Sequence, residues 1–253
     1  MNTPIKTATP ALDKVMLIID FIAHNGPQTF SSIYQNLNLP KSSTSTLLGS
    51  MLAHKILRQN NDKYDLGLRL YEIGTHAFAH FDIKEYALPI LKKLRDDSGL
   101  TCHLGVLEGN NPVYLLKVES SYAVIVNSWI GKRLPINSTA LGKIFLAFSD
   151  ENKALELIEN QFPLQKYTEK TIIAPDELMQ QRAQVKNQGF AIDNQEDVTG
   201  IVCLAAPIFD SNQKLIAAIS MSGVLAQYEK SSIEHMVNLL KEAATQISHK
   251  AIA

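Results

Sequence analysis

Apolar residues recur at helical spacing in two consecutive segments near the N-terminus. Thr9 and Pro10 suit the cap and the first position of a first helix, and the Asn-Gly-Pro sequence at residues 25–27 ends it. A second, shorter helix is predicted from about Thr29 to Leu37, because its apolar residues are three or four positions apart. Residues 38–40, which read Asn-Leu-Pro, then turn the chain.

The segment that follows this turn predicts a third helix with an apolar face and a small polar face. The buried face is formed by Thr44, Leu47, Leu48 and Met51. The outer face carries Lys41, Ser42, Ser43, Ser45 and Thr46. A helix with such small outer side chains fits the DNA major groove, which is about 12 Å wide. A Ser/Thr-rich helix start is equally typical of a well-capped, solvated helix, so this helix alone does not decide the function.

Two short extended runs follow, and together they predict a β-hairpin. The runs cover Ile56–Gln59 and Lys63–Leu66, and Asn60, Asn61 and Asp62 between them favour a turn. Helix, helix, turn, helix and hairpin in this order are typical of a winged helix-turn-helix, a DNA-binding module in which the hairpin is the wing.

This interpretation assigns DNA contacts to small hydroxyls, to three basic residues and to the tip of the wing. We expect contacts to base edges or phosphates from Ser42, Ser43, Ser45 and Thr46. We expect neutralisation of phosphates by Lys41, Arg58 and Lys63, and Asn60 and Asn61 should lie at the tip of the wing.

Beyond the hairpin, the pattern predicts a linker helix and then a mixture of helices and strands. The linker helix covers Leu68–Phe81, and its apolar stripe suits pairing with a second copy of the chain. The expected domains are therefore a winged helix-turn-helix at residues 1–67, the linker at 68–82 and a second domain at 83–253. In the second domain, helices are predicted at Ile83–Asp97, Thr139–Phe148, Asp150–Asn160, Pro175–Gln188 and Tyr228–Ser248, and strands at Thr101–Glu108, Pro112–Val118, Ala123–Trp129, Phe190–Asp193, Ile201–Phe209 and Leu215–Ser222.

Length and composition agree with two domains and favour the cytoplasm. The chain has 253 residues and two cysteines, and no apolar run approaches the length of a membrane-spanning helix. Residues 1–80 carry seven Lys/Arg and five Asp/Glu, against seventeen and twenty in the remainder, which permits DNA binding by the first part without requiring it.

Two short motifs suggest ion binding but lack necessary parts. His76 and His80 have the spacing of zinc ligands, yet the Glu of a zinc protease is missing between them. Gly142-Lys143 resembles the end of a phosphate-binding loop, but Asn137 replaces its first glycine and Ile144 replaces its Ser/Thr. We therefore expect no metal and no cofactor.

An enzyme is the principal alternative that the sequence leaves open. A hydrolase or lyase of small molecules would use Asp193, paired with Glu196 or Asp197, together with Cys203. Cys203 lies within an apolar strand, however, where a cysteine is more often a small buried hydrophobic residue. A further alternative is a winged helix that binds a protein partner in place of DNA.

Four stretches, in this order and spacing, give the chain a specific resemblance to a known family. They are Leu39–Thr44, Leu134–Lys143, Gly189–Asp193 with Glu196, and Cys203–Asp210 continuing to Ala217–Gly223. Together with the winged helix, they make the chain resemble the IclR family of bacterial transcription regulators over nearly its whole length.

The resemblance implies an α+β protein whose C-terminal domain is GAF-like, with an antiparallel sheet flanked by helices. It also implies dimers or dimers of dimers on palindromic double-stranded operators, and a small organic acid, most simply a carboxylic acid, as the effector that modulates operator binding.

By position, the resemblance places the effector site in the C-terminal domain. It implies backbone contacts at Ala140 and Leu141, side-chain contacts from Asp193, Cys203, Ser220 and Ser222, and an apolar wall that includes Ala123, Val126 and Leu134. Backbone N–H groups at a helix start favour an anion, and two serines two positions apart project from one face of a strand.

Two positions depart from what many relatives have. Thr46 stands where relatives often carry an arginine on the recognition helix, and Asn137 stands where they often carry a histidine. The first change removes a side chain that reads guanine, so the operator sequence is expected to differ.

Overall fold

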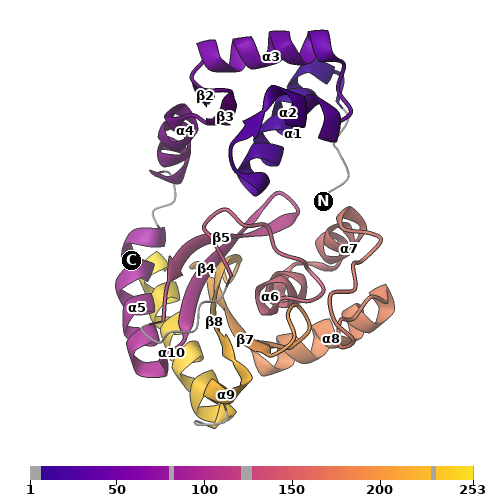
Figure 1. The fold of residues 1–253 in the computed structure, drawn as a ribbon. Coiled ribbons are helices and arrows are strands. Elements are labelled where there is room, and N and C mark those ends of the chain that lie inside the picture. The colour runs from indigo at the N-terminus through magenta and orange to yellow at the C-terminus, as the bar shows by residue number, and fades with distance from the viewer. Residues whose placement is uncertain (1–6, 80–82, 121–126, 229–231, 253) are drawn as a thin grey trace. The chain divides into compact units, whose positions relative to one another are not determined.

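The chain forms two compact units, Met1–Phe81 and Asp82–Ala253, each with a sheet of its own. The structure is a computed structural model that describes residues 7–79, 83–120, 127–228 and 232–252 (Figure 1). Both units combine helices with an antiparallel sheet, so the α+β class expected from the sequence is confirmed.

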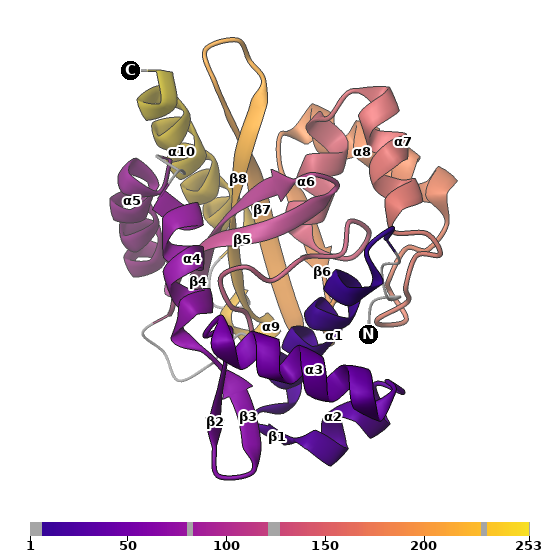
Figure 2. The ribbon, with the colours of Figure 1, turned by 90° about the horizontal axis from the view of Figure 1, so that it is seen from above.

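The first unit has the predicted three helices and hairpin (Figures 1 and 2). Its elements are α1 (Pro10–Asn25), β1 (Gln28–Thr29), α2 (Phe30–Asn36), α3 (Lys41–Ala53), β2 (Leu57–Asn60), β3 (Lys63–Leu66) and α4 (Leu68–Ala79). The sheet has the order β1-β3-β2. The sequence pattern does not predict β1, because two residues are too few to show a period.

The core of this unit is formed by the apolar faces that the spacing predicts. Its fully buried residues are Ile18, Ile22, Ile33, Leu48, Met51 and Leu57. Thr44 is also buried on α3, and its hydroxyl donates to the carbonyl of Pro40 at 2.9 Å. Thr29 caps α2 by accepting a hydrogen bond from the N–H of Ser32 at 3.2 Å. Thr9 occupies the cap position of α1 but, among the described residues, makes no side-chain bond to that helix.

The second unit is built on a five-stranded antiparallel sheet with the order β5-β4-β8-β7-β6. Its elements are α5 (Ile83–Ser98), β4 (Thr101–Glu108), β5 (Asn111–Val118), α6 (Ala140–Phe148), α7 (Glu151–Asn160), α8 (Pro175–Gln188), β6 (Ala191–Asn194), β7 (Ile201–Phe209), β8 (Leu215–Val224), α9 (Leu225–Tyr228) and α10 (Ile233–Ile252).

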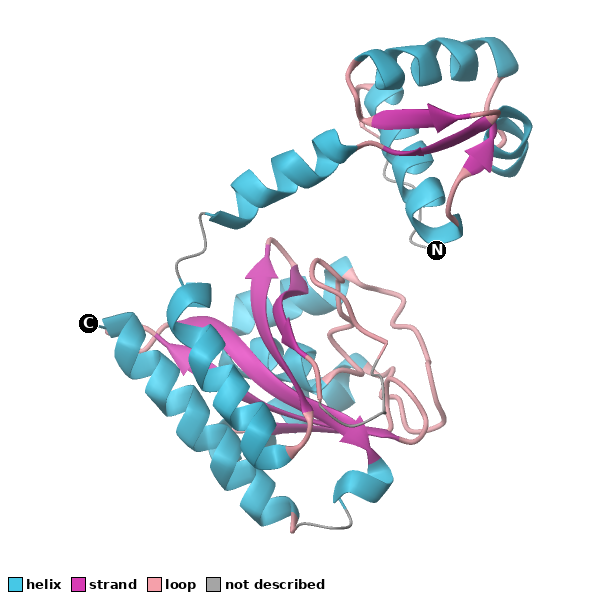
Figure 3. Cartoon of the chain, turned by 60° about the vertical axis from the view of Figure 1, so that its left-hand side comes forward, coloured by secondary structure: helices cyan, strands magenta, loops and turns pink. Residues whose placement is uncertain are grey.

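Helices cover both faces of this sheet. Figures 1 and 3 show α5 and α10 side by side along one face, and α6 lies on the other with α8 packed against it. Since neighbouring residues of a strand point to opposite faces, Leu204 and Met221 belong to the α10 side while Cys203 and Ser222 face α6.

Two predictions for this unit differ from the structure in the described residues. The expected strand Ala123–Trp129 lies mostly outside the described residues, and residues 127–129 form no strand. This segment instead leads to a single bridge between Val113 and Arg133. Helix α5 runs through Pro89, which lies inside it. The last predicted helix is divided into α9 and α10.

Gly142 offers a test of how closely α6 packs on the preceding loop. A methyl group there would press on the carbonyl oxygen of Pro135 and lie 2.8 Å from the Cα of Ile136. Because neither backbone atom can move away easily, Gly142→Ala should destabilise the protein by about 1–3 kcal/mol in denaturant unfolding. Gly74→Ala on α4 is the matched control, since open space surrounds it, and should stabilise by up to about 1 kcal/mol. Equal effects of the two changes would contradict this packing.

Candidate nucleic-acid interface and ligand site

The outer face of α3 is narrow and polar. Lys41, Ser42, Ser45 and Thr46 are exposed and Ser43 is half-buried. The hydroxyls of Ser43 and Thr46 donate to the carbonyls of Pro40 and Ser42, at 3.1 and 3.3 Å, so both side chains lie close to the helix. The face has no acidic residue, which suits the approach of a phosphate backbone.

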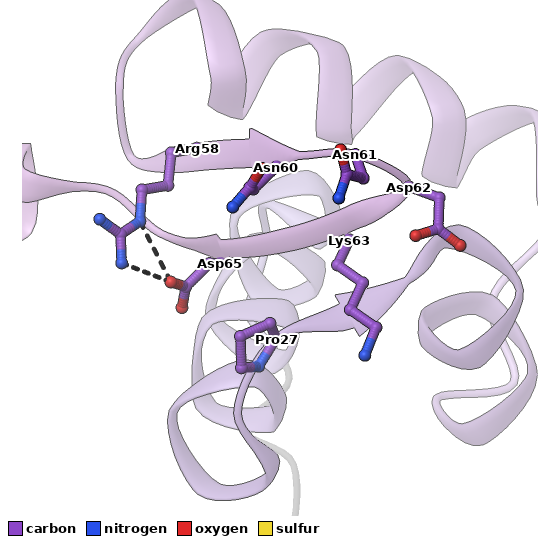
Figure 4. Close-up of a pocket in the computed structure, with 7 residues that line it drawn as sticks. All are labelled: Pro27, Arg58, Asn60, Asn61, Asp62, Lys63 and Asp65. Carbon is purple, nitrogen blue, oxygen red and sulfur yellow. Dashed lines mark hydrogen bonds and ion pairs between the residues drawn. The ribbon is translucent and has the colours of Figure 1, made fainter.

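The wing, formed by β2 and β3, lines a pocket of about 560 Å³ together with Pro27 (Figure 4). Its turn consists of Asn61 and Asp62, with Asn61 in the left-handed region at φ 55°, a conformation that asparagine tolerates well. Asn60, expected in the turn, is instead the last residue of β2, paired with Lys63. Both asparagine side chains lie near the tip in Figure 4.

Arg58 and Lys63, the two basic residues predicted on the wing, differ in their partners. Arg58 lies opposite Asp65 in the hairpin, and its guanidinium bonds to one carboxylate oxygen through Nε at 3.1 Å and Nη2 at 2.5 Å. This hydrogen bond lowers the pKa of Asp65 below its ordinary value. Lys63 is exposed and has no ion-pair partner within the described part of the chain. Lys63 can therefore bind a phosphate directly, whereas Arg58 must first leave Asp65.

In the second unit, the sheet register brings four polar residues from four strands into one row. Asp193 on β6 lies opposite Cys203 on β7, which lies opposite Ser222 on β8, which lies opposite Thr101 on β4. We call these four residues the polar row. Directly opposite side chains are about 4.5–5.5 Å apart at Cβ, so the row is continuous.

Ser220 belongs to the neighbouring row on the same face, as the spacing of the two serines predicts. It lies between Ala205 and His103, and both Ser220 and Ser222 are 2% exposed. The structure thus brings together Asp193, Cys203, Ser220 and Ser222, which the sequence associates only by resemblance.

The start of α6 lies against this face of the sheet. Thr139 caps the helix by accepting from the N–H of Gly142 at 3.0 Å. The first N–H groups of a helix lack internal acceptors, so those of Ala140 and Leu141 are suited to bind an anion. Leu134 is 3% exposed and belongs to the same apolar cluster as Ala140 and Leu141. Ala123 and Val126, the other predicted wall residues, lie outside the described residues.

A buried hydrogen-bond network fixes the start of α6 to the turn between β6 and β7. Lys143 is 2% exposed, and its ammonium group contacts both carboxylate oxygens of Glu196 at 2.5 and 2.6 Å and the carbonyl of Ile192 at 2.9 Å. Asp193 accepts from the N–H of Glu196 at 2.7 Å. Asp197 accepts from the hydroxyl of Ser138, the residue before the cap of α6, at 2.8 Å.

Burial governs the protonation of the site. It raises the pKa of Asp193 to about 7, and the nearby carboxylates of Asp197 and Glu196 add to this rise. Burial also raises the pKa of the Cys203 thiol well above its ordinary value, with Asp193 contributing. Cys203 is therefore a protonated thiol that serves as a weak hydrogen-bond group, and it lacks the thiolate that a nucleophile needs.

Two residues of this site are not predicted by the sequence pattern. Lys143 is part of an incomplete phosphate-loop motif, and its buried ion pair depends on a turn 53 positions away. His103 is fully buried beside Ser220, and its only signal in the sequence is a histidine within a mostly apolar strand.

Asn137, the other departure from the relatives, has a structural role. It is 1% exposed, and its amide nitrogen donates to the carbonyls of Gln165 and Ile172, at 3.1 and 2.8 Å. It thereby ties the segment before α6 to the loop between α7 and α8.

Neither a metal cluster nor a membrane helix is found in the described ranges. No three His, Cys, Asp or Glu side chains there gather as metal ligands, and His80 of the predicted pair lies outside them. Among these residues no helix has the length and apolarity to cross a membrane.

A winged helix-turn-helix followed by a separate α+β domain with a buried polar site is the architecture of a DNA-binding regulator with a sensor domain. The family model of the IclR helix-turn-helix domain matches residues 11–61, and that of the bacterial transcriptional regulator IclR C-terminal domain matches residues 75–249. The chain belongs to the IclR family of bacterial transcription regulators.

Similar proteins span nearly the whole chain. RhmR, an uncharacterised HTH-type transcriptional regulator of Escherichia coli strain K12, is 34% identical over 240 residues, which cover 94% of this chain and 92% of RhmR. The crystal structure of the Thermotoga maritima IclR is 32% identical, with a TM-score of 0.77 over 96% of this chain and 98% of that one. An IclR homolog from Microbacterium hydrocarbonoxydans, crystallised with 4-hydroxybenzoate, shares the fold at 24% identity, with a TM-score of 0.81 over 95% and 98% of the two chains.

These matches confirm the resemblance and exclude the enzyme alternative. The protein is a DNA-binding transcription regulator with an effector-binding C-terminal domain.

Asp193→Asn should reveal the raised pKa of Asp193 as a dependence of stability on pH. Between about pH 4 and pH 7 the folded protein holds a proton on Asp193 that the unfolded chain has released. The contribution of this group to stability is therefore complete below that window and is lost as the pH rises through it. Asparagine retains the acceptor oxygen without the charge, so the melting temperature of the variant, relative to the wild type, should rise across the window and level off above it. A difference that does not change with pH would contradict a raised pKa.

Proposed function

We propose that the protein binds palindromic operators as a homodimer or dimer of dimers in the cytoplasm, and that a small carboxylic acid in the C-terminal domain modulates this binding. In this proposal residues 1–67 bind DNA, residues 68–82 link the domains and residues 83–253 bind the effector. The observation that carries it is the start of α6, a helix that packs on the sheet face with the polar row, of which Thr101, Asp193 and Ser222 are buried.

The DNA contacts come from α3 and the wing. The slim face formed by Lys41, Ser42, Ser43, Ser45 and Thr46 enters the major groove, while Lys63, Asn60 and Asn61 reach the flanking backbone. Arg58 joins them only when a phosphate displaces Asp65 from its guanidinium. This exchange costs little, because the Arg58 side chain is 63% accessible and ion pairs at the surface are weak.

The effector carboxylate binds to the N–H groups of Ala140 and Leu141. A partial positive charge at the helix start favours an anion there, and the buried surroundings strengthen the interaction. Ser220 donates its hydroxyl proton to the same carboxylate. Asp193, Cys203 and Ser222 bind the polar remainder of the acid, and Leu134 and Val126 border its apolar part. Of these residues, Val126 rests on the family resemblance alone.

An apolar surface on α4 supports assembly through the linker. Leu68 and Tyr71 are each 76% exposed and Ile73 is 50% exposed, which is unusual for three large apolar residues on one short helix. Pairing of two linker helices would cover Leu68 and Tyr71, which lie three positions apart on one side of α4, and would set the spacing of two winged domains. An effector that favours one spacing over another needs a coupling energy of only about 1–3 kcal/mol.

Lys63→Ala tests the assignment of the wing. Loss of one phosphate contact should weaken binding to any duplex, including one of random sequence, and should lower the slope of log affinity against log salt by about 1 per protomer. Lys93→Ala on α5 is the control, because Lys93 is an exposed lysine on the other unit, and it should change neither quantity. An unchanged slope in Lys63→Ala would remove Lys63 from the interface.

A double substitution, Ser220→Ala with Ser222→Ala, tests the effector site. Acetate, pyruvate, succinate, benzoate and 4-hydroxybenzoate would be screened by thermal shift, since a ligand at 100 times its Kd adds about 2.7 kcal/mol of stability. The variant should lose the shift and the effector response in gel-shift assays, while its operator affinity stays that of the wild type. Ser211→Ala, in the exposed turn between β7 and β8, should behave as wild type. A full response in the double variant would overturn the site.

A further inference from the structure

His103 lies at the back of the proposed effector site, on the sheet face toward α6. It is fully buried on β4, directly opposite Ser220 on β8. Its ring stacks on that of Tyr114, with centroids 4.2 Å apart and planes inclined by 23°. This stack fixes the plane in which the two ring nitrogens point.

Each ring nitrogen of His103 faces a serine hydroxyl. Nε2 lies 2.8 Å from the Oγ of Ser128, and Nδ1 lies 3.5 Å from the Oγ of Ser220. The ring therefore connects the segment after β5 to a predicted effector-binding residue. The contact to Ser220 is at the long end of hydrogen-bond distances.

The charges around His103 are unequal on its two sides. Lys117 donates to the backbone carbonyl of Ser128 at 2.8 Å, and Lys132 donates to that of Asn127 at 3.4 Å. Lys117 thus binds the same residue, Ser128, that faces Nε2. Glu119, an exposed carboxylate 2.8 Å from Lys117, offsets part of this charge.

These surroundings keep the imidazole neutral. Burial and the two lysines lower the pKa of His103 to about 3. A neutral imidazole has one donor and one acceptor nitrogen. Positive charge beside Nε2 stabilises a lone pair there, so the proton is placed on Nδ1. The hydroxyl of Ser128 then donates to Nε2, and Nδ1–H donates to the oxygen of Ser220.

We propose that His103 is a positioning residue that sets the specificity of the effector site, because its Nδ1–H occupies the oxygen of Ser220 and leaves the Ser220 hydroxyl proton free to bind the effector's carboxylate. The inference rests on the proposed carboxylate site. With the opposite tautomer, Ser220 would donate to Nδ1 and present only lone pairs to the ligand, which would favour a hydroxyl donor and repel a carboxylate.

The position of the proton can be measured without any effector. In protein labelled with ¹⁵N-histidine, the His103 signals are those lost in His103→Asn. We expect Nδ1 to have the shift of a protonated nitrogen and Nε2 that of a bare one, unchanged from about pH 5 to pH 8, where ordinary histidines titrate. A bare Nδ1, or an imidazolium in that range, would overturn the proposal.

Three substitutions separate positioning from a merely structural role, with acetate as the probe in calorimetric titrations. The amide nitrogen of His103→Asn can replace Nδ1, that of His103→Gln can replace Nε2, and His103→Phe retains the stack on Tyr114. We expect acetate affinity near that of the wild type in the Asn variant and about tenfold weaker in the Gln and Phe variants. A structural role predicts the reverse order, with Phe the least affected, and wild-type affinity in His103→Phe would refute positioning.

The two proposals can fail separately. If acetate does not bind the wild type, the carboxylate site of the proposed function is wrong, and the assigned role of Ser220 toward a carboxylate fails with it. The nitrogen shifts still decide where His103 carries its proton. If acetate binds but the tautomer is the opposite one, the effector site stands and only the role of His103 is overturned.

Discussion

The buried ion pair between Lys143 and Glu196 is the interaction on which the effector domain's site depends. Taking either charge out of water alone costs several kcal/mol, so each group needs its partner in place. The ammonium of Lys143 is met by both carboxylate oxygens of Glu196 and by the carbonyl of Ile192. Because Lys143 is one turn from the start of α6 and Glu196 is three residues from Asp193, the pair fixes the distance between the anion-binding helix start and the polar row.

The polar side chains near this ion pair follow the same rule: a polar group that is removed from water needs a hydrogen-bond partner. Among the described residues, no buried side-chain nitrogen or oxygen lacks a partner. Asn137 binds two carbonyls, Asp193 accepts two backbone N–H groups, and His103 lies between two serines. A rigid network of this kind presents a ligand with groups of fixed direction, which is what selectivity for one small acid over another requires.

The DNA-binding unit follows a different principle, since its functional groups are exposed and its precision comes from the apolar core beneath them. Leu48 on the inner face of α3 belongs to the same core as Ile18 and Ile33. Because this inner face anchors the helix, the outer face can be small and polar without loss of stability. The wing shows the limit of inferring contacts from charge alone. Arg58 and Lys63 are both exposed cations on one hairpin, yet the cross-strand neighbour Asp65 engages the first and leaves the second available.

The sequence by itself determined the order of helices and strands, the faces of α1 to α3, the wing and the family, because these depend on the spacing of side chains within short segments. It also placed Ser220 and Ser222 on one face, since a strand has a period of two. It did not determine β1, the bridge between Val113 and Arg133, the pairing of Arg58, or the roles of Lys143 and His103. Those depend on sheet register and on turns that bring together residues up to 117 positions apart, such as His103 and Ser220, and only the folded chain fixes such neighbours.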